Sequence, residues 1–229
     1  MADLESLTPA ARHTQDGAKP RLNIAALSSE DSDLVQSELR HRFHNIVAIT
    51  QSLVNQTLRD DVPVAEARES LSKRLAAMGS AVDLLLQNDW QPSSLHSTLS
   101  TALTHPVDMR DRIRRDGPDL QVGSSAVMTL TLALHELQTN AIKYGALSSP
   151  EGMVELFWKV VDGPPGKRLW MQWAERDGPP VQPPTKQGLG TRLISKATGR
   201  ALGGEAKLEY TPAGATWFLI APLDRISVS

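Results

Sequence analysis

Two long amphipathic segments separated by a proline-containing break constrain the fold of this chain most strongly. Apolar residues recur at steps of three and four in residues 31–59, and at coiled-coil spacing in residues 64–87. The sequence DDVP at residues 60–63 ends the first helix, because proline restricts its own backbone and that of the residue before it. We therefore predict an antiparallel helical hairpin over residues 30–90. Its open apolar face would pair with a second copy, so we expect a homodimer containing a four-helix bundle.

Composition excludes several classes of protein. The chain has 229 residues, enough for one large or two modest domains, and a net charge of −2 that does not favour nucleic acid or anionic membranes. It has no cysteine, which excludes disulfides, thiolate metal sites and cysteine nucleophiles. No run of eighteen apolar residues and no secretory signal is present. We expect a cytoplasmic protein with a flexible N-terminal tail over residues 1–29 and no membrane segment.

Residues 91–225 mix strands and helices. Alternating apolar residues predict a strand over residues 153–160, and a turn at residues 162–166 leads to a returning strand around residues 169–173. Helices are expected over residues 94–104, 126–143 and 191–202, a short strand over residues 112–118, and a final hairpin over residues 206–221. This order predicts an α+β fold in which the hairpin is followed by an α/β sandwich with helices on one face of the sheet.

The segment LHELQTNAIKYGALS, residues 134–148, carries the first candidate site. Glu136, Asn140 and Lys143 share one face of the predicted helix, and Tyr144 is adjacent. A carboxylate, an amide and an ammonium placed in this way can hold a metal ion and the phosphates that it neutralises. The same spacing also occurs on ordinary solvated helix faces, which are the commoner case.

A second candidate is His41 in the sequence ELRHRFHNIV. It lies about 200° around the helix from Leu39 and Phe43, so it faces away from the apolar seam. An exposed imidazole can act as a nucleophile near neutral pH, and Arg42 and Asn45 could steady an incoming phosphoryl group. An isolated surface histidine without a function is the alternative.

Two further motifs are compatible with a nucleotide. Trp173 and Glu175 lie two residues apart in a strand and face the same side, where an indole and a carboxylate suit a purine. Gly188 and Gly190 before Thr191 open a helix and would let the backbone approach phosphate. Taken alone, a core tryptophan and a lone GxG explain these patterns as well.

Taken together and in this order, the motifs resemble those of the HWE class of bacterial sensor histidine kinases, over about residues 31–223. His41, Arg42 and Asn45 match the H-R-x-x-N phosphoacceptor motif. Residues 135–148 match the ATP-site helix of the class, and Trp173-x-Glu175 with the Gly-Pro-Pro at residues 178–180 matches the segment that, together with His135, gives the class its name. Later glycines match at residues 188, 190 and 203–204.

The resemblance implies a helical dimerisation and phosphotransfer domain, then a Bergerat-type ATP-binding domain, with ATP and Mg²⁺ as cofactors. It implies autophosphorylation of His41, helped by Arg42, Asn45 and Glu136, and transfer to the receiver domain of a response regulator. Asn140 would ligate Mg²⁺. The implied nucleotide-binding residues are His135, Glu136, Asn140, Lys143, Tyr144, Trp173, Glu175, Asp177, Gly178, Gly188, Gly190 and Thr191. The loop over residues 177–187 would close over the nucleotide.

Three departures from the class pattern bear on function. His44 stands where a lysine is common, and Asp177 stands where the first of two glycines is common, beside Glu175 or the phosphates. No sensor domain is expected, so the signal would come from a separate sensor or regulatory protein. The alternatives are a dimeric relay protein that carries phosphate on His41 with a degenerate ATP domain, and a serine kinase with the same ATP fold. The hairpin that bears His41 disfavours the serine kinase.

Overall fold

The computed structural model of the protein describes residues 29–58, 62–103, 111–164, 166–181 and 189–227, and excludes the side chains of residues 29–35, 38, 41, 56 and 189. The tail predicted for residues 1–29 therefore lies outside the described residues, apart from its last residue. Residue contacts divide the chain into two compact units, residues 1–44 and residues 45–229. The domain boundary predicted near residue 90 stays a prediction.

Helix α1 spans Ser29–Thr57 and begins in the first unit. Within the described part of that unit, Leu39 and Phe43 are 55% and 66% exposed, in line with the prediction that a single hairpin leaves part of its apolar face open. In the second unit the same seam is buried at Leu53. The apolar face of α1 is therefore covered near its C-terminal end and open near its middle.

Helix α2 spans Val64–Gln87 and runs antiparallel to the C-terminal part of α1, as predicted. Thr50 Oγ1 donates to Met78 Sδ at 3.5 Å, and Arg74 Nη1 donates to Thr57 Oγ1 at 2.7 Å. Residue numbers thus rise along α1 as they fall along α2. The helix ends where the Trp90 amide donates to the Leu85 carbonyl at 2.7 Å, at the boundary expected from the sequence.

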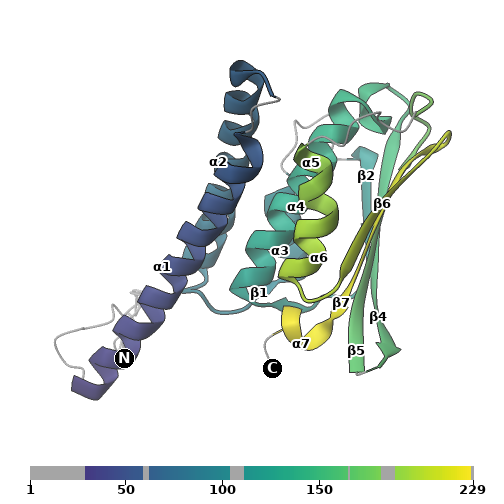
Figure 1. Ribbon diagram of the computed structural model, residues 1–229. Coiled ribbons are helices and arrows are strands. Elements are labelled where there is room, and N and C mark those ends of the chain that lie inside the picture. The colour runs from purple at the N-terminus through teal and green to yellow at the C-terminus, as the bar shows by residue number, and fades with distance from the viewer. Residues whose placement is uncertain (1–28, 59–61, 104–110, 165, 182–188, 228–229) are drawn as a thin grey trace, which may run out of the picture. The chain divides into compact units, whose positions relative to one another are not determined.

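The α/β part of the second unit is a five-stranded sheet in the order β2-β4-β5-β7-β6, in which β2 is parallel to β4 and the other neighbours are antiparallel. Helices cover one face of this sheet (Figure 1), which confirms the α+β prediction. The strands are β2 (Ile113–Asp116), β4 (Met153–Gly163), β5 (Gly166–Arg176), β6 (Glu205–Thr211) and β7 (Gly214–Pro222). Its helices include α3 (Leu95–Ala102), α4 (Ser124–Lys143) and the short α7 (Leu223–Ile226), together with a helical segment that begins at Leu189.

The core lies between the sheet and the helices. Of the residues predicted to face inward, Trp158 of β4 and Trp173 of β5 are fully buried, whereas Val160 of β4 is half-buried. Trp217 of β7 is buried beside them. Buried indoles need an acceptor, and Trp158 Nε1 donates to the Pro118 carbonyl at 2.7 Å. Among the described helices, none combines the length and the apolar character needed to cross a membrane.

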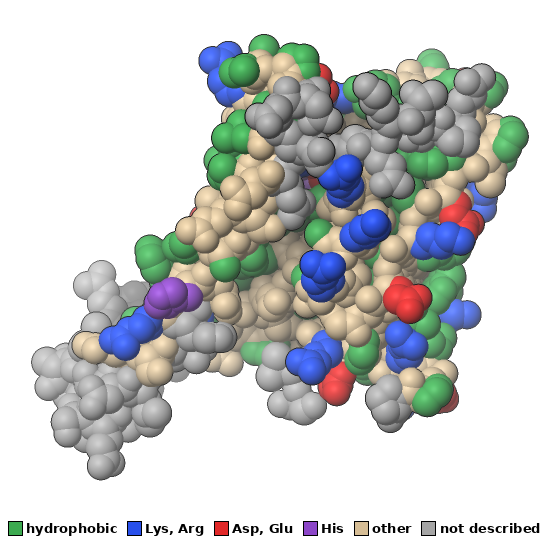
Figure 2. Space-filling view, viewed as in Figure 1, with side chains coloured by type: hydrophobic (Ala, Val, Ile, Leu, Met, Phe, Trp, Pro, Cys, Tyr) green, Lys and Arg blue, Asp and Glu red, His purple; other side chains and the backbone are tan. Residues whose placement is uncertain are grey.

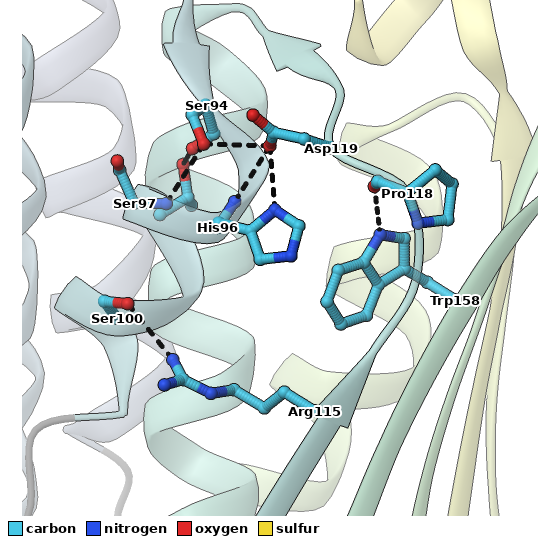
Figure 3. Close-up of polar contacts among 9 residues, drawn as sticks. Ser94, His96, Ser97, Ser100, Arg115, Pro118, Asp119 and Trp158 are labelled. Atoms are coloured by element: carbon cyan, nitrogen blue, oxygen red, sulfur yellow. Dashed lines mark hydrogen bonds and ion pairs between the residues drawn. The ribbon is translucent and has the colours of Figure 1, made fainter.

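A small second sheet was not predicted. Strands β1 (Ser93–Ser94) and β3 (Gln121–Val122) pair antiparallel and lead into α3 and α4. Figure 3 shows the polar cluster beside this pair: Ser94 Oγ donates to Asp119 Oδ1 at 2.8 Å and accepts from the Ser97 amide at 3.3 Å. His96 Nδ1 lies 3.0 Å from the same carboxylate oxygen. The cluster fixes the start of α3 on the loop that precedes β3.

Candidate functional site

A cavity of about 320 Å³ opens beside the C-terminal end of α4. Its size lies at the lower end of the range for small-molecule sites. One wall comes from α4, a second from β5, β6 and β7, and a third from the helical segment that begins at Leu189. The lining residues are Leu137, Asn140, Tyr144, Gly145, Glu175, Pro180, Val181, Gly190, Thr191, Ile194, Leu208, Tyr210 and Ala215.

Glu175 supplies a buried carboxylate at the end of β5. Its Oε2 accepts from the Ala146 amide at 2.8 Å, and its Oε1 lies 3.4 Å from Trp173 Nε1. Burial raises the pKa of Glu175, and the hydrogen bonds from Ala146 and Trp173 oppose that rise. A carboxylate accepts about four hydrogen bonds, so Glu175 can still accept a donor from the cavity.

The turn after α4 approaches this carboxylate closely. The 3₁₀ helix η3 (Ala146–Ser148) follows Gly145, whose missing side chain leaves room for Glu175. A Cβ built on Gly145 would overlap Glu175 Oε2. Glycine at this position therefore allows the backbone amide of Ala146 to reach the carboxylate.

The polar stripe predicted on α4 is formed by Glu136, Asn140 and Lys143, and its members have different surroundings. Asn140 lines the cavity. Glu136 is buried and accepts from Arg74 through both oxygens, from Nε at 2.9 Å and from Nη2 at 3.0 Å. Lys143 is exposed, and its Nζ lies 3.8 Å from Glu69 Oε1.

The helical segment that begins at Leu189 brings Gly190 and Thr191 to the cavity. It consists of α5 (Leu189–Arg192), the π-helix η4 (Leu193–Ala197) and α6 (Thr198–Ala201). A Cβ on Gly190 would lie 2.5 Å from Glu136 Oε2 and 3.7 Å from Asn140 Nδ2. Glycine thus lets this segment pack against the polar stripe.

A row of cations covers the outer side of the same segment. Arg192, Lys196 and Arg200 are exposed, and Figure 2 shows basic side chains gathered over these helices. Positive charge next to a cavity raises the local concentration of anionic ligands.

Trp173 lies elsewhere than expected, which corrects the prediction that its indole packs on a purine in the cavity. The side chain is fully buried in the core and is absent from the cavity wall. Its ring occupies the space between sheet and helices, because the inward face of β5 points there. What it offers the site is a hydrogen bond to Glu175.

Three other predicted residues do not line the cavity. Burial lowers the pKa of His135, and its Nε2 has no hydrogen-bond partner among the described residues. Asp177 is exposed and has a left-handed backbone, with φ of +55°, which explains why glycine suits this position. Gly178 packs so closely on Ala146 that a Cβ would overlap its backbone.

The remaining predicted residues lie on α1 or outside the described residues. Gly188 and most of the loop over residues 177–187 lie outside the described residues, as does the side chain of His41. Arg42 lies in the first unit and Asn45 at the start of the second, both on α1. His44 is exposed, with its Nδ1 2.7 Å from the Arg40 carbonyl.

Sequence reasoning missed most of the apolar wall of the cavity, formed by Leu137, Ile194, Leu208, Tyr210 and Ala215. Leu208 and Tyr210 lie two residues apart on β6, so the sequence indicates that they share one face of the predicted strand. Their position opposite α4 depends on the order of the strands in the sheet, which no local pattern encodes.

The residues of this cavity fit a purine nucleotide with Mg²⁺. The apolar side chains can pack on a flat ring, and Glu175 is placed to accept from an exocyclic amine. Asn140 offers an amide oxygen, a suitable ligand for an ion that binds few protein groups and keeps several waters.

Comparison with known proteins agrees with this fit. Residues 38–119 match the model of the family described as HWE histidine kinase. Proteins named blue-light-activated histidine kinase from Brucella anthropi and Brucella ovis are 38% and 36% identical to this chain over 195 and 192 residues. The alignments cover 84% and 83% of this chain but 40% and 39% of the relatives, so the chain spans about two fifths of their length.

A solved structure supports the fold. The Erythrobacter litoralis EL346 blue-light activated histidine kinase matches with a TM-score of 0.56 at 19% identity, covering 87% of this chain and 61% of that chain. This likeness concerns the fold, a helical hairpin followed by an α/β domain with helices on one face of the sheet. The chain belongs to the HWE histidine kinase family, which confirms the resemblance seen in its motifs.

Proposed function

We propose that this chain is an ATP-dependent protein-histidine kinase that phosphorylates its own His41 and passes the phosphoryl group to a response-regulator aspartate. The observation that carries the proposal is that Asn140 of α4 and Glu175 of β5 line one cavity of nucleotide size. Family membership supports the same activity. A homodimer, a receiver-domain partner and a separate sensor or regulatory protein belong to this proposal.

The base end of the cavity would be formed by Glu175 and the apolar wall. Glu175 accepts a hydrogen bond from the adenine amine, while Leu137 and Ile194 pack on the ring. Trp173 and the Ala146 amide hold the carboxylate in place through the bonds that they already make to it.

The phosphate end would be formed by the polar stripe and the neighbouring cations. Asn140 ligates Mg²⁺, Lys143 contacts phosphate, and the exposed row over residues 192–200 attracts the anion. Mg²⁺, when bound, neutralises phosphate charge and orients the leaving group.

The chemistry would be a phosphoryl transfer governed by placement. An uncharged nitrogen of His41 attacks the γ-phosphorus, a P–N bond forms, the P–O bond to the β-phosphate breaks, and ADP leaves. Arg42 and Asn45 steady the transferring group. In the second step an aspartate oxygen of the regulator displaces His41 from phosphorus.

One labelling experiment tests the proposal. The purified protein is incubated with γ-³²P-labelled ATP and Mg²⁺, and the label is tested for loss in acid. Acid-labile label that is absent from His41→Ala supports the kinase. The absence of label, together with acceptance of phosphate from a phosphorylated regulator, would show a relay protein, and acid-stable label on an added protein would show a serine kinase.

The metal role of Asn140 is tested separately. Asn140→Ala should reduce labelling by at least about 100-fold, because placement and charge neutralisation supply most of the rate in this chemistry. Thr129→Ala, on the same helix but away from the cavity, should label like the wild type. Undiminished labelling of Asn140→Ala would mean that the metal site is misplaced.

A further inference from the structure

Helix α2 contacts the polar stripe of α4 through two ion pairs of opposite polarity. The first pair joins Arg74 to Glu136, and the arginine side chain is only 1% exposed. Both carboxylate oxygens are used, and the same guanidinium donates to Thr57 Oγ1 of α1. One arginine thus ties both helices of the hairpin to the helix that lines the cavity.

The second pair joins Glu69 of α2 to Lys143 of α4 at 3.8 Å. Glu69 also accepts from Lys73 at 2.5 Å, one turn along α2. The hydrogen bond and charge of Lys73, with the charge of Lys143, hold the pKa of Glu69 below its usual range. Glu69 is therefore an anion whenever Lys143 is near it at neutral pH.

The order of charges along the two helices specifies their register. Along α2 the acid precedes the base, and along antiparallel α4 the acid also precedes the base, so each charge meets its opposite. A shift by one turn would leave the carboxylate of Glu136 buried without its partner, which is strongly unfavourable.

The two pairs involve both charged members of the polar stripe. Asn140 lies between them in sequence and lines the cavity, whereas Glu136 has both oxygens bound and Lys143 is next to an anion. A phosphate group that approaches Lys143 must compete with Glu69. A role for Glu136 at the nucleotide requires Arg74 to release it.

We propose that α2 acts as a clasp on the nucleotide site: Arg74 holds Glu136, Glu69 holds Lys143, and the clasp opens when nucleotide engages the stripe. This inference rests on the proposed function and adds to it a means by which the position of the hairpin controls the ATP site. Because coupling is reciprocal, bound nucleotide weakens the docking of α2, and a weakened clasp strengthens nucleotide binding to the same extent.

The distance between α2 and the sheet tests the clasp without any phosphorylation. The chain has no native cysteine, so Ser80→Cys on α2 and Asp162→Cys on β4 can be spin-labelled selectively. Pulsed electron paramagnetic resonance on the nucleotide-free protein, with labelled chains diluted in unlabelled protein so that only distances within one chain are measured, should give one narrow distance distribution. Arg74→Met should broaden it toward longer distances, and Arg74→Lys should do so less, because lysine keeps the charge but loses the planar fork.

Two further variants make the result decisive. Arg68→Met removes an exposed arginine of the same helix and should leave the distribution unchanged. If Arg74→Met misfolds because Glu136 is left unpaired, the double variant Arg74→Met/Glu136→Met removes the stranded charge and should fold with a broadened distribution. A distribution identical to wild type in Arg74→Met, or in the double variant where the single one misfolds, would overturn the clasp.

Nucleotide binding measures the coupling. Glu69→Gln should bind Mg²⁺ with a non-hydrolysable ATP analogue about two- to fivefold more tightly than wild type in calorimetry, the range expected for one exposed ion pair. Glu66→Gln, one turn earlier on α2, should bind like wild type. Equal affinities for all three proteins would contradict the coupling. Failure of every protein to bind would count against the proposed function, while the nucleotide-free distances still decide the clasp.

Discussion

The contact between Glu175 and the backbone at Ala146 determines the shape of the cavity at the level of single residues. A buried carboxylate is held by one amide and one indole, and both bonds depend on a close approach that Gly145 permits. The sequence indicated Glu175 as a site residue but gave no sign that the glycine thirty residues before it completes the same contact.

Gly145→Ala should break the contact between the Glu175 carboxylate and the Ala146 amide. The added Cβ cannot coexist with Glu175 Oε2, so the carboxylate or the turn must move and the bond to the Ala146 amide is lost. We expect a loss of about 1–3 kcal/mol in the free energy of unfolding, measured in urea, and at least about tenfold weaker nucleotide binding. Gly79→Ala is the control: its Cβ meets nothing within 4 Å, and alanine should stabilise α2 by about 0.5–1 kcal/mol.

A substitution of Asp177 should stabilise the protein, whereas Gly145→Ala should destabilise it. Its left-handed backbone is strained for a residue with a side chain, and its carboxylate does not line the cavity. Asp177→Gly should therefore raise the melting temperature by a few degrees, equivalent to about 0.5–1 kcal/mol, and leave nucleotide affinity within about twofold. A several-fold change in affinity would show that Asp177 acts on the nucleotide, the possibility its place in the sequence raised.

At the level of elements, the sequence predicted helices and strands better than their partners. The hairpin, α4, the β4–β5 pair and the final hairpin β6–β7 follow from periodicity and from proline and glycine breaks. The β1–β3 pair and the parallel pairing of β2 with β4 do not, because β1, β2 and β3 are two to four residues long and too short to show a period. The N-cap of α3 is the local residue Ser94, but its hydroxyl is held by Asp119, which is 25 residues away in the sequence.

The contacts of Asp119 give a prediction about pH. The hydrogen bond with His96 is the main cause that lowers the pKa of Asp119 to about 2, from an ordinary value near 3.9. A lowered pKa means that the stabilisation is complete above about pH 4 and is lost as the pH falls through 2. Asp119→Asn should lower the free energy of unfolding at pH 7 by about 1 kcal/mol or less, because the pair is solvent-exposed.

Urea unfolding at pH 7, 4 and 2.5 checks this expectation. The difference between wild type and Asp119→Asn should shrink toward the lowest pH, while Asp116→Asn on β2 should show no such trend. A difference that stays constant with pH would mean that the carboxylate charge is not what holds the start of α3 (Figure 3).

At the scale of the whole molecule, the features that sequence reasoning could not supply are those joining distant segments. Arg74 and Glu136 are 62 residues apart and each looks like part of a solvated helix face. The seam on α1 is apolar along its length, yet Leu39 and Phe43 are exposed in the single chain while Leu53 is buried. Periodicity shows that a face is apolar but does not identify what covers it.

The exposed part of that seam leads to a prediction about assembly. If it pairs with a second copy, Phe43→Glu should shift a dimer toward monomer in sedimentation velocity at micromolar concentration, because it places a charge in an apolar contact. Gln36→Glu adds the same charge at another exposed position of α1 and should stay dimeric. A wild-type protein that sediments as a monomer would remove the homodimer from the proposed function.

The π-helix in the wall of the cavity gives this segment about one residue more than an ordinary helix would need for the same rotation. Over Leu193–Ala197 the helix is wider by one residue per turn, and the Thr198 hydroxyl donates to the carbonyl five residues back. Deleting a single residue there would restore an ordinary helix, because a turn of α-helix covers the same rotation with about one residue fewer. Gly190 and Thr191 would then stay in phase with α6 and keep their place beside α4. A one-residue deletion within Leu193–Ala197 should therefore be tolerated better than one at an α-helical position of the segment, which would rotate the residues before it by about 100°.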